Sequence, residues 1–202
     1  QKADNCYLYR GYNLVDLGEY AKALADYDKS LELDSKDTWI YTSRSWAHLY
    51  ANDGDKSYEQ AVTFLELNGL KGDSAPYAIV SGYLGLRKAK KNLGAKAFLD
   101  TWLPQLKPDA WTTTIIKYFH GDVTAAQMLG LAIDNGKMTE AHAYIGMMAL
   151  FSGTPASASI HFNWVKDNGT KTFVEYDLAL AELNRLAAAP PKSAGSVRKK
   201  KS

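Results

Sequence analysis

The chain has 202 residues, 46% of them hydrophobic, so it can bury a sizeable core. It contains no apolar run approaching the roughly 18 residues of a membrane-spanning helix, and its single cysteine, Cys6, excludes a disulfide within the chain. The net charge of +2 is unevenly distributed: residues 190–202 carry five basic residues and no acidic one, whereas the rest of the chain has 19 basic and 22 acidic residues. A basic tail therefore follows a mildly acidic body.

Residues 7–37 have the pattern of two amphipathic helices joined by a tight turn. Apolar residues recur at helical spacing on both sides of Gly18, and the second helix is expected over residues 20–33. Gly18 suits the turn, because glycine takes the left-handed conformation that ends a helix without a Cβ clash. The pattern recurs one period of about 34 residues later, where Tyr41 follows Tyr7.

This stretch resembles a tetratricopeptide repeat (TPR), a helix–turn–helix unit that stacks into solenoids. The residues on the family's spaced positions are Tyr7, Gly11, Leu14, Gly18, Tyr20, Ala23 and Tyr27. The same relative positions recur later in the chain at Gly146, Gly153, Ala158 and Phe162. The resemblance implies a binding scaffold built from stacked helical hairpins.

The second repeat and the last helix have their own start signals. The turn at residues 52–55 is expected to be about two residues longer than the first one. Ser57 with Gln60 predicts a capping box at the start of the following helix, and Thr172 with Glu175 predicts another at the start of the last helix.

The fourth repeat is expected to be short. A helix bearing Trp111 is followed by a partner whose single apolar face holds Ala126, Leu129 and Ile133. Asn135-Gly136 predicts the next turn.

Together these signals predict an all-α protein, a right-handed TPR-type solenoid of about five helical hairpins plus a C-terminal capping helix. Residues 1–187 are expected to form a single superhelical domain. Residues 188–202, rich in Ala, Pro, Ser, Gly and Lys, are expected to be a disordered basic tail, because they cannot bury enough surface to offset chain entropy.

In the TPR family, ligands usually lie on the inner surface that the first helix of each hairpin presents, as extended or helical peptides. Tyr and Trp concentrated there would suit capture of a protein or peptide partner. The candidate partner-binding residues are Tyr9, Tyr12, Trp39, Trp46, Tyr50, Tyr144 and Met147. Asp16 and Glu140 fall on the same register. The alternative is that several of these rings fill the interfaces between repeats.

One TPR subclass grips the acidic tail of a chaperone through Lys, Asn and Arg at fixed first-helix positions. Leu8, Tyr12 and Ser43 hold the corresponding positions, so a chaperone tail is not the expected ligand.

Signals of catalysis are missing from the sequence. The four histidines, His48, His120, His142 and His161, form no H-E-x-x-H arrangement and have no cysteine partner. No glycine-rich phosphate loop follows a strand. We therefore expect a non-enzymatic protein without a metal or cofactor.

The basic segments suggest a rival function. Residues 87–91 with Lys96, and residues 198–201, could attract nucleic acid or an anionic membrane surface, although such clusters more often serve only solubility. We expect neither as the main partner. A third possibility is a homo-oligomer, in which exposed end repeats stack between copies.

Residues 108–186 are similar to the C-terminal half of bacterial envelope TPR proteins, including outer-membrane lipoproteins that act as adaptors for peptidoglycan hydrolases and proteases. The shared features are the helix at 111–121, the run EAHAYIG at 140–146 and the run FVEY at 173–176. The resemblance implies an adaptor in the periplasm or envelope; the alternative is the cytoplasm. The residues before Cys6 lack the apolar and small side chains of a lipoprotein processing site, so Cys6 is expected to be an ordinary helix residue.

Overall fold

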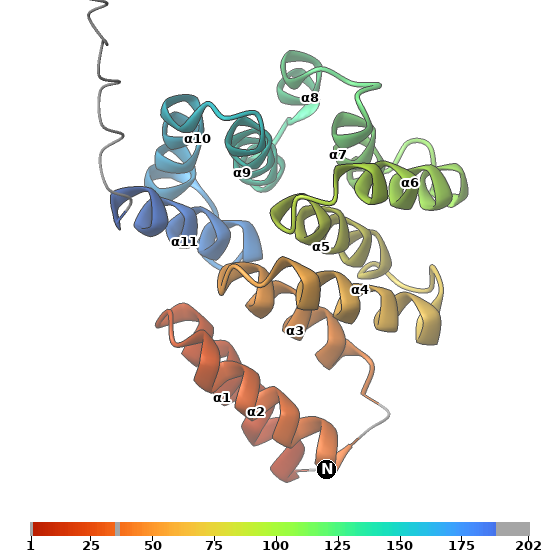
Figure 1. The fold of residues 1–202 in the computed structure, drawn as a ribbon, viewed down its shortest axis with the longest axis vertical. Coiled ribbons are helices and arrows are strands. Elements are labelled where there is room, and N and C mark those ends of the chain that lie inside the picture. Colours follow the sequence, from red (N-terminus) through yellow and green to blue (C-terminus); the bar gives the residue numbers. More distant parts are fainter. Residues whose placement is uncertain (1, 35–36, 189–202) are drawn as a thin grey trace, which may run out of the picture.

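The computed structural model describes residues 2–34 and 37–188, which fold into α-helices stacked as hairpins, without a strand in these ranges (Figure 1). The helices are α1 (Lys2–Asp16), α2 (Tyr20–Leu33), α3 (Trp39–Tyr50), α4 (Gly54–Asn68), α5 (Ala75–Lys88), α6 (Asn92–Trp102), α7 (Trp111–His120), α8 (Ala125–Leu131), α9 (Asn135–Phe151), α10 (Pro155–Asn168) and α11 (Val174–Ala188), with a 3-10 turn, η1, at Leu103–Gln105. The predicted all-α solenoid is confirmed.

The first and fifth hairpins share one packing feature, a glycine on the first helix that faces an aromatic ring on the second. A Cβ added to Gly11 would lie 2.4 Å from the Tyr27 ring, and one added to Gly146 would lie 2.5 Å from the Phe162 ring. Both rings are almost fully buried. The first and fifth repeats therefore pack alike, as their matching spacing indicates, and glycine is needed because the ring occupies the place of its side chain.

The turns inside the hairpins also share one geometry. The left-handed residue is Gly18 (φ +74°) in the first hairpin, Asn52 (φ +65°) in the second, Lys90 (φ +61°) in the third and Gly153 (φ +76°) in the fifth. The turn in the second hairpin is therefore no longer than that of the first, and the expected two-residue extension is wrong. The sequence was misleading because Asn52, not Gly54, corresponds to Gly18; asparagine tolerates this conformation.

Gly54 has a different role, in close helix packing. A Cβ on this residue would lie 2.4 Å from the carbonyl oxygen of Gly85, so only glycine lets α4 approach α5 here. Helix α4 begins at Gly54, and the Asp53 carboxylate caps it by accepting from the Lys56 amide at 3.3 Å. The capping box predicted at Ser57 is therefore wrong, because Ser57 is buried inside the helix.

The fourth hairpin is the least regular. Helix α8 has only seven residues and buries Met128, whereas Ile133 lies beyond its end and is 82% exposed, so the predicted apolar face is wrong. The turn expected at residues 135–136 is instead the start of α9, which Asp134 caps by accepting from the Lys137 amide at 2.8 Å.

Helix α11 joins the last hairpin of the solenoid to the second one. It covers α9 and α10 as the expected cap, and it also contacts α3 (Figure 1). The Tyr50 hydroxyl of α3 donates to the carbonyl of Val174 at 2.9 Å, and Arg185 donates to the carbonyl of Tyr50. Lys88 and Glu182, whose side chains are 6% and 5% exposed, form an ion pair at 2.5 Å between α5 and α11. The helix begins at Val174, so the capping box predicted at 172–175 is wrong.

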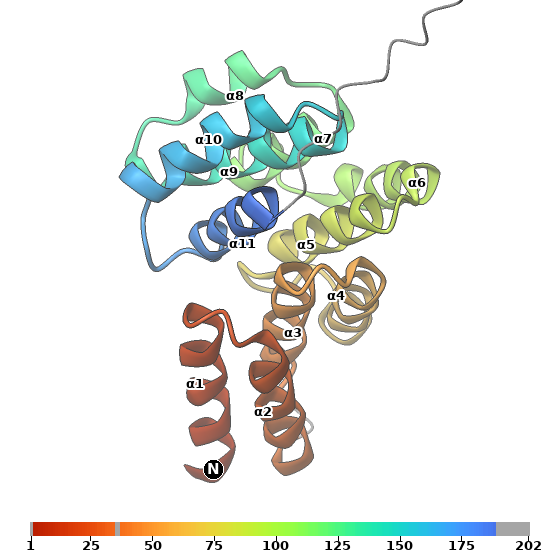
Figure 2. The same cartoon turned by 60° about the vertical axis from the view of Figure 1, so that its left-hand side comes forward.

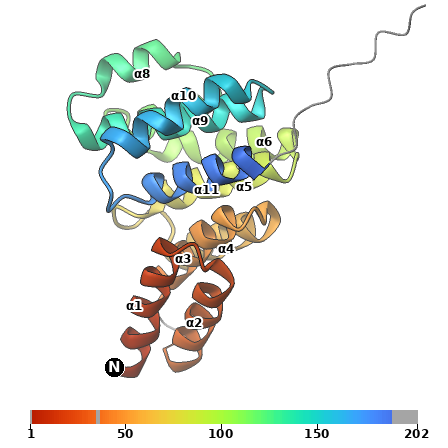
Figure 3. The same ribbon diagram turned by 90° about the vertical axis from the view of Figure 1, so that its left-hand side faces the viewer.

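The N-terminal hairpin projects from one end of the molecule, and α2 packs on α3 (Figures 2 and 3). Cys6 lies within α1 as an exposed free thiol. Helix α11 includes residue 188, and the remainder of the expected tail lies outside the described residues. Within the described ranges, no helix has the length and apolar character needed to cross a bilayer.

Candidate functional site

A cavity of about 810 Å³ lies on the inner side of the solenoid, where the first helices of four hairpins meet the start of α11. Helices α1, α3, α5 and α9 each contribute to its wall, and the turn before α11 closes one side. Its aromatic lining residues are Tyr12, Tyr27, Trp39, Trp46, Tyr50, Tyr77 and Phe173. We call it the inner cavity.

Three of its side chains form a hydrogen-bonded row along one wall. The Trp39 indole N–H donates to the Tyr12 hydroxyl at 3.1 Å, and that hydroxyl lies 3.2 Å from Oγ of Ser43. Burial raises the pKa of Tyr12, so its hydroxyl stays protonated at neutral pH. Trp39 is half exposed, so a ligand can reach its ring directly.

Trp46 and Tyr50 lie deeper in the same cavity. They are 5% and 2% exposed, and their ring centroids lie 6.2 Å apart. Both therefore shape the cavity and support the interface between repeats at the same time. Their burial fits the packing interpretation that the sequence left open, and their place in the cavity lining leaves partner binding as a prediction.

The other three candidate residues lie elsewhere. Tyr9 is 63% exposed and packs edge-on against Tyr12, outside the cavity lining. Tyr144 and Met147 are fully buried, because α9 is enclosed by α10, α11 and α7. The solenoid turns these two positions into its core instead of onto an open surface.

Buried carboxylates form the floor of the inner cavity. Glu140 accepts hydrogen bonds from the Tyr77 hydroxyl at 2.7 Å and from the Trp111 indole at 2.5 Å. Glu175 accepts one from the Tyr144 hydroxyl. Burial raises the pKa of Glu140; burial and then the charge of Glu140 raise that of Glu175 to about 8.

Two further carboxylates lie nearer the opening. Asp16 is the last residue of α1, and Asp177 is in the first turn of α11. Burial and then the charge of Asp16 raise the pKa of Asp177 to about 7. The cavity is thus apolar along one wall and acidic at its floor and mouth.

The contribution of residues 171–177 was not predicted as part of the site. Glu175 and Asp177 lie in the first turn of α11, where acidic side chains are favourable at the positive end of the helix dipole. This ordinary explanation does not indicate that they also line a cavity. Only the fold-back of α11 onto α3 brings them opposite Asp16 and Tyr50. The one signal available in the sequence was that Asp16 and Glu140 fall on the groove-facing register, from which no acidic site was predicted.

Part of the basic run that suggested nucleic-acid or membrane binding has partners within the fold. The partners are Phe151 for Arg87, Glu182 for Lys88, Asp55 for Lys91 and Asp100 for Lys96. Arg87 lies over an aromatic face and Lys88 is in a buried ion pair, whereas Lys90, Lys91 and Lys96 are exposed.

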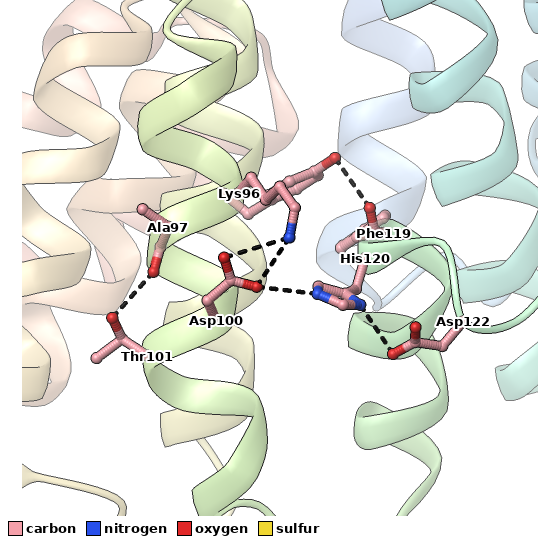
Figure 4. A network of polar contacts seen from close by, with 8 residues as sticks. Lys96, Ala97, Asp100, Thr101, Phe119, His120 and Asp122 are labelled. Atoms are coloured by element: carbon pink, nitrogen blue, oxygen red, sulfur yellow. Dashed lines mark hydrogen bonds and ion pairs between the residues drawn. The ribbon is translucent and has the colours of Figure 1, made fainter.

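The histidines take structural positions. Figure 4 shows His120 between Asp100 of α6, 3.0 Å from Nε2, and Asp122, 2.8 Å from Nδ1. Both carboxylates raise the His120 pKa, Asp122 first. The Nδ1 atoms of His142 and His161 lie 3.0 Å apart, and burial lowers the pKa of His142 to about 4, so this pair is neutral. Across the described ranges, no three His, Cys, Asp or Glu side chains gather to hold a metal ion.

Comparison with known proteins supports the repeat architecture. No family model matches the chain. It is 25% identical over 193 residues to the lipoprotein NlpI homolog of Haemophilus influenzae, a match that covers 92% of this chain and 60% of that protein. The chain therefore spans less than two thirds of the relative's length.

A solved structure shows the same fold. The crystal structure of a tetratricopeptide repeat protein from Parabacteroides merdae matches with a TM-score of 0.55 and 16% identity, over 88% of this chain and 70% of that chain. This chain is a TPR-type solenoid whose sequence is similar to that of an NlpI-type lipoprotein.

Proposed function

We propose that the protein is a non-enzymatic adaptor that binds an extended segment of a partner protein in the inner cavity. The observation that carries the proposal is the aromatic cavity of about 810 Å³, which opens on the inner side of a TPR solenoid. Its volume falls in the range of about 300–1,000 Å³ that is usual for ligand sites. It can take a few side chains of a partner, not a folded domain.

The chemistry of the wall supports peptide capture. Trp39 and Tyr12 expose ring faces beside polar atoms, a combination that is enriched where binding energy is concentrated. The hydroxyl of Ser43 adds a hydrogen-bonding group at the same wall. These side chains are already held by each other, so binding costs little side-chain ordering.

The location and the assembly state are part of this proposal. Similarity to a lipoprotein supports a site of action in the bacterial envelope.

Tyr9 and Leu17, which are 63% and 72% exposed on the projecting hairpin, offer a surface for a second copy. The contacts of Arg87 and Lys88 within the fold favour this proposal over an electrostatic binder that uses the run at 87–91.

Site-specific photo-crosslinking in the native host tests the proposal. The photoreactive residue p-benzoylphenylalanine replaces Trp39, at the mouth of the cavity, in one variant. In the matched control it replaces Leu93, which is 89% exposed on α6 and outside the cavity. Both positions carry an exposed large apolar side chain, and p-benzoylphenylalanine keeps an aromatic ring at position 39 while losing the indole hydrogen bond to Tyr12, so circular dichroism is used to check that both variants fold.

We expect a covalent adduct with a partner protein from position 39 and not from position 93. Peptide mapping by mass spectrometry then identifies the partner segment. Adducts of equal yield from both positions, or none from position 39 in cells in which the protein is active, would refute binding at the inner cavity.

A further inference from the structure

We propose that the inner cavity selects its partner segment through a lysine or arginine side chain, whose stem lies along the aromatic wall and whose cation lies between Asp16 and Asp177. This inference rests on the proposed function and adds the chemistry by which the cavity recognises its ligand.

The charge around the cavity is strongly one-sided. Five carboxylates and one ammonium group line it; the acidic residues are Asp16, Asp73, Glu140, Glu175 and Asp177, and the basic one is Lys171. In the part of the chain that the structure describes, the side chains of Asp16, Asp73 and Asp177 have neither an ion pair nor a hydrogen bond. Glu175, with a pKa of about 8, is mostly protonated at neutral pH, so the negative charge lies mainly on the other acidic residues, and Lys171 is the one basic residue in the lining.

Asp16 and Asp177 come from opposite ends of the chain and face the same opening. Both line the inner cavity, and burial and then the charge of Asp16 raise the pKa of Asp177, as expected for two acidic groups that face the same space. Asp16 also ends α1, where a negative charge meets the negative end of the helix dipole. Helix stability therefore does not explain why an aspartate stands at position 16. A cation between Asp16 and Asp177 would offset both their mutual repulsion and the unfavourable helix-dipole interaction of Asp16.

The aromatic wall suits the rest of such a side chain. Arg and Lys cover apolar surface with their stems and place their charge over ring faces, best of all over tryptophan. Trp39 supplies an accessible ring at the mouth, and Trp46 and Tyr50 extend the wall inward. Rings and carboxylates in one cavity are the combination that binds organic cations.

Other ligand chemistries fit less well. An acidic segment would add charge of the same sign to an already acidic site. A purely apolar segment would remove Asp16 and Asp177 from water without supplying a partner, at a cost of several kcal/mol for each buried charge. A cationic side chain is the one class that uses both the wall and the mouth.

Selection from a display library of random peptides tests the inference with the full chain. The variant D16N/D177N removes the two charges while keeping side-chain size. The variant E66Q/D109N makes the same change in net charge at two exposed acids outside the cavity. D16N/D177N should fold at least as stably as the wild type, because each charge is unfavourable where it lies, and circular dichroism checks this.

We expect the selected peptides to share an arginine or lysine at one position. Replacing an arginine there with citrulline, its neutral isostere, should weaken binding about 10- to 100-fold, the range that a hydrogen bond to a charged group contributes. D16N/D177N should lose a similar factor and E66Q/D109N should not. The citrulline peptide should bind the wild type and D16N/D177N equally.

Three outcomes would overturn the inference. Peptides that bind the cavity, as judged by crosslinking from position 39, but share no basic residue would refute the cation and leave the proposed function standing. Crosslinking from position 39 to residues 189–202 of the chain itself would mean that its own tail, and not a partner, occupies the cavity. A library that yields no cavity-dependent peptide would count against both proposals.

Discussion

Replacing Gly146 with alanine should destabilise the fifth hairpin, which holds Glu140 in the site. The new Cβ would lie 2.5 Å from one atom of the Phe162 ring and 2.8 Å from the next, well inside van der Waals contact. Phe162 is fully buried, so the ring cannot move into solvent. Overpacking of this kind costs about 1–3 kcal/mol, and alanine recovers about 1 kcal/mol through its higher helix propensity. Because the contact is so close, we expect a net loss of about 1–2 kcal/mol.

Urea unfolding followed by circular dichroism measures this loss, with two further variants as controls. Gly94→Ala is a matched control in α6, where the nearest atom would be 3.9 Å away, so it should stabilise by up to about 1 kcal/mol. In a Phe162→Leu background the penalty of Gly146→Ala should shrink, because the ring that it meets is gone. If Gly146→Ala were as stable as the wild type, the packing of the ring against this glycine would be refuted.

Three other predictions concern pH and the site. Stability should fall as pH rises from about 6.5 to 8, above the range in which the lowered pKa values of His48, His142 and His161 contribute in the opposite sense. The reason is that the pKa values of Glu175 and Asp177, about 8 and about 7, lie above their unfolded values, so the folded state binds more protons. Glu175→Gln should flatten this slope in urea titrations across that range. His120→Ala should lower the free energy of unfolding by up to about 1 kcal/mol at pH 5.5, which is below the unfolded pKa of histidine, and by less at pH 8. The reason is that the raised pKa of His120 reflects ion pairs that are lost when the ring loses its proton. An equal loss at both pH values would contradict charged pairing. Trp39→Ala should weaken partner binding and lower the free energy of unfolding by less than about 1 kcal/mol, because the side chain is half exposed. Trp46→Ala should lower it by about 3–5 kcal/mol, because this side chain is only 5% exposed. Equal losses in unfolding experiments would show that Trp39 is a packing residue.

The repeat pattern was readable because it depends on neighbours along the helix. Gly11 and Tyr27 meet within one hairpin, and Gly146 and Phe162 repeat that contact, so spacing alone identifies both pairs. The errors arose where two residues could fill one role. The sequence favours Gly54 as the turn residue, but the left-handed residue of the turn is Asn52. Gly54 is instead needed because α4 approaches α5 closely at this position.

Part of the aromatic lining of the candidate site was also predictable. Tyr12 lies on α1, and Trp39, Trp46 and Tyr50 lie on α3, where helical periodicity puts them toward the inner surface. The same periodicity could not separate an open groove from a closed interface. Tyr144 holds an equivalent register and is fully buried, because α11 covers that part of α9.

The sequence by itself determined the helices, their pairing into hairpins and the aromatic character of the inner surface, because all three follow from contacts at short sequence separation. Only the tertiary structure decided where that surface stays open and what charge it carries. Both depend on α11 folding back onto α3, which brings Asp177 to the mouth opposite Asp16 and ties Val174 to Tyr50. Such a contact joins residues more than a hundred positions apart, and its free energy comes from burial and hydrogen bonds that no local pattern records.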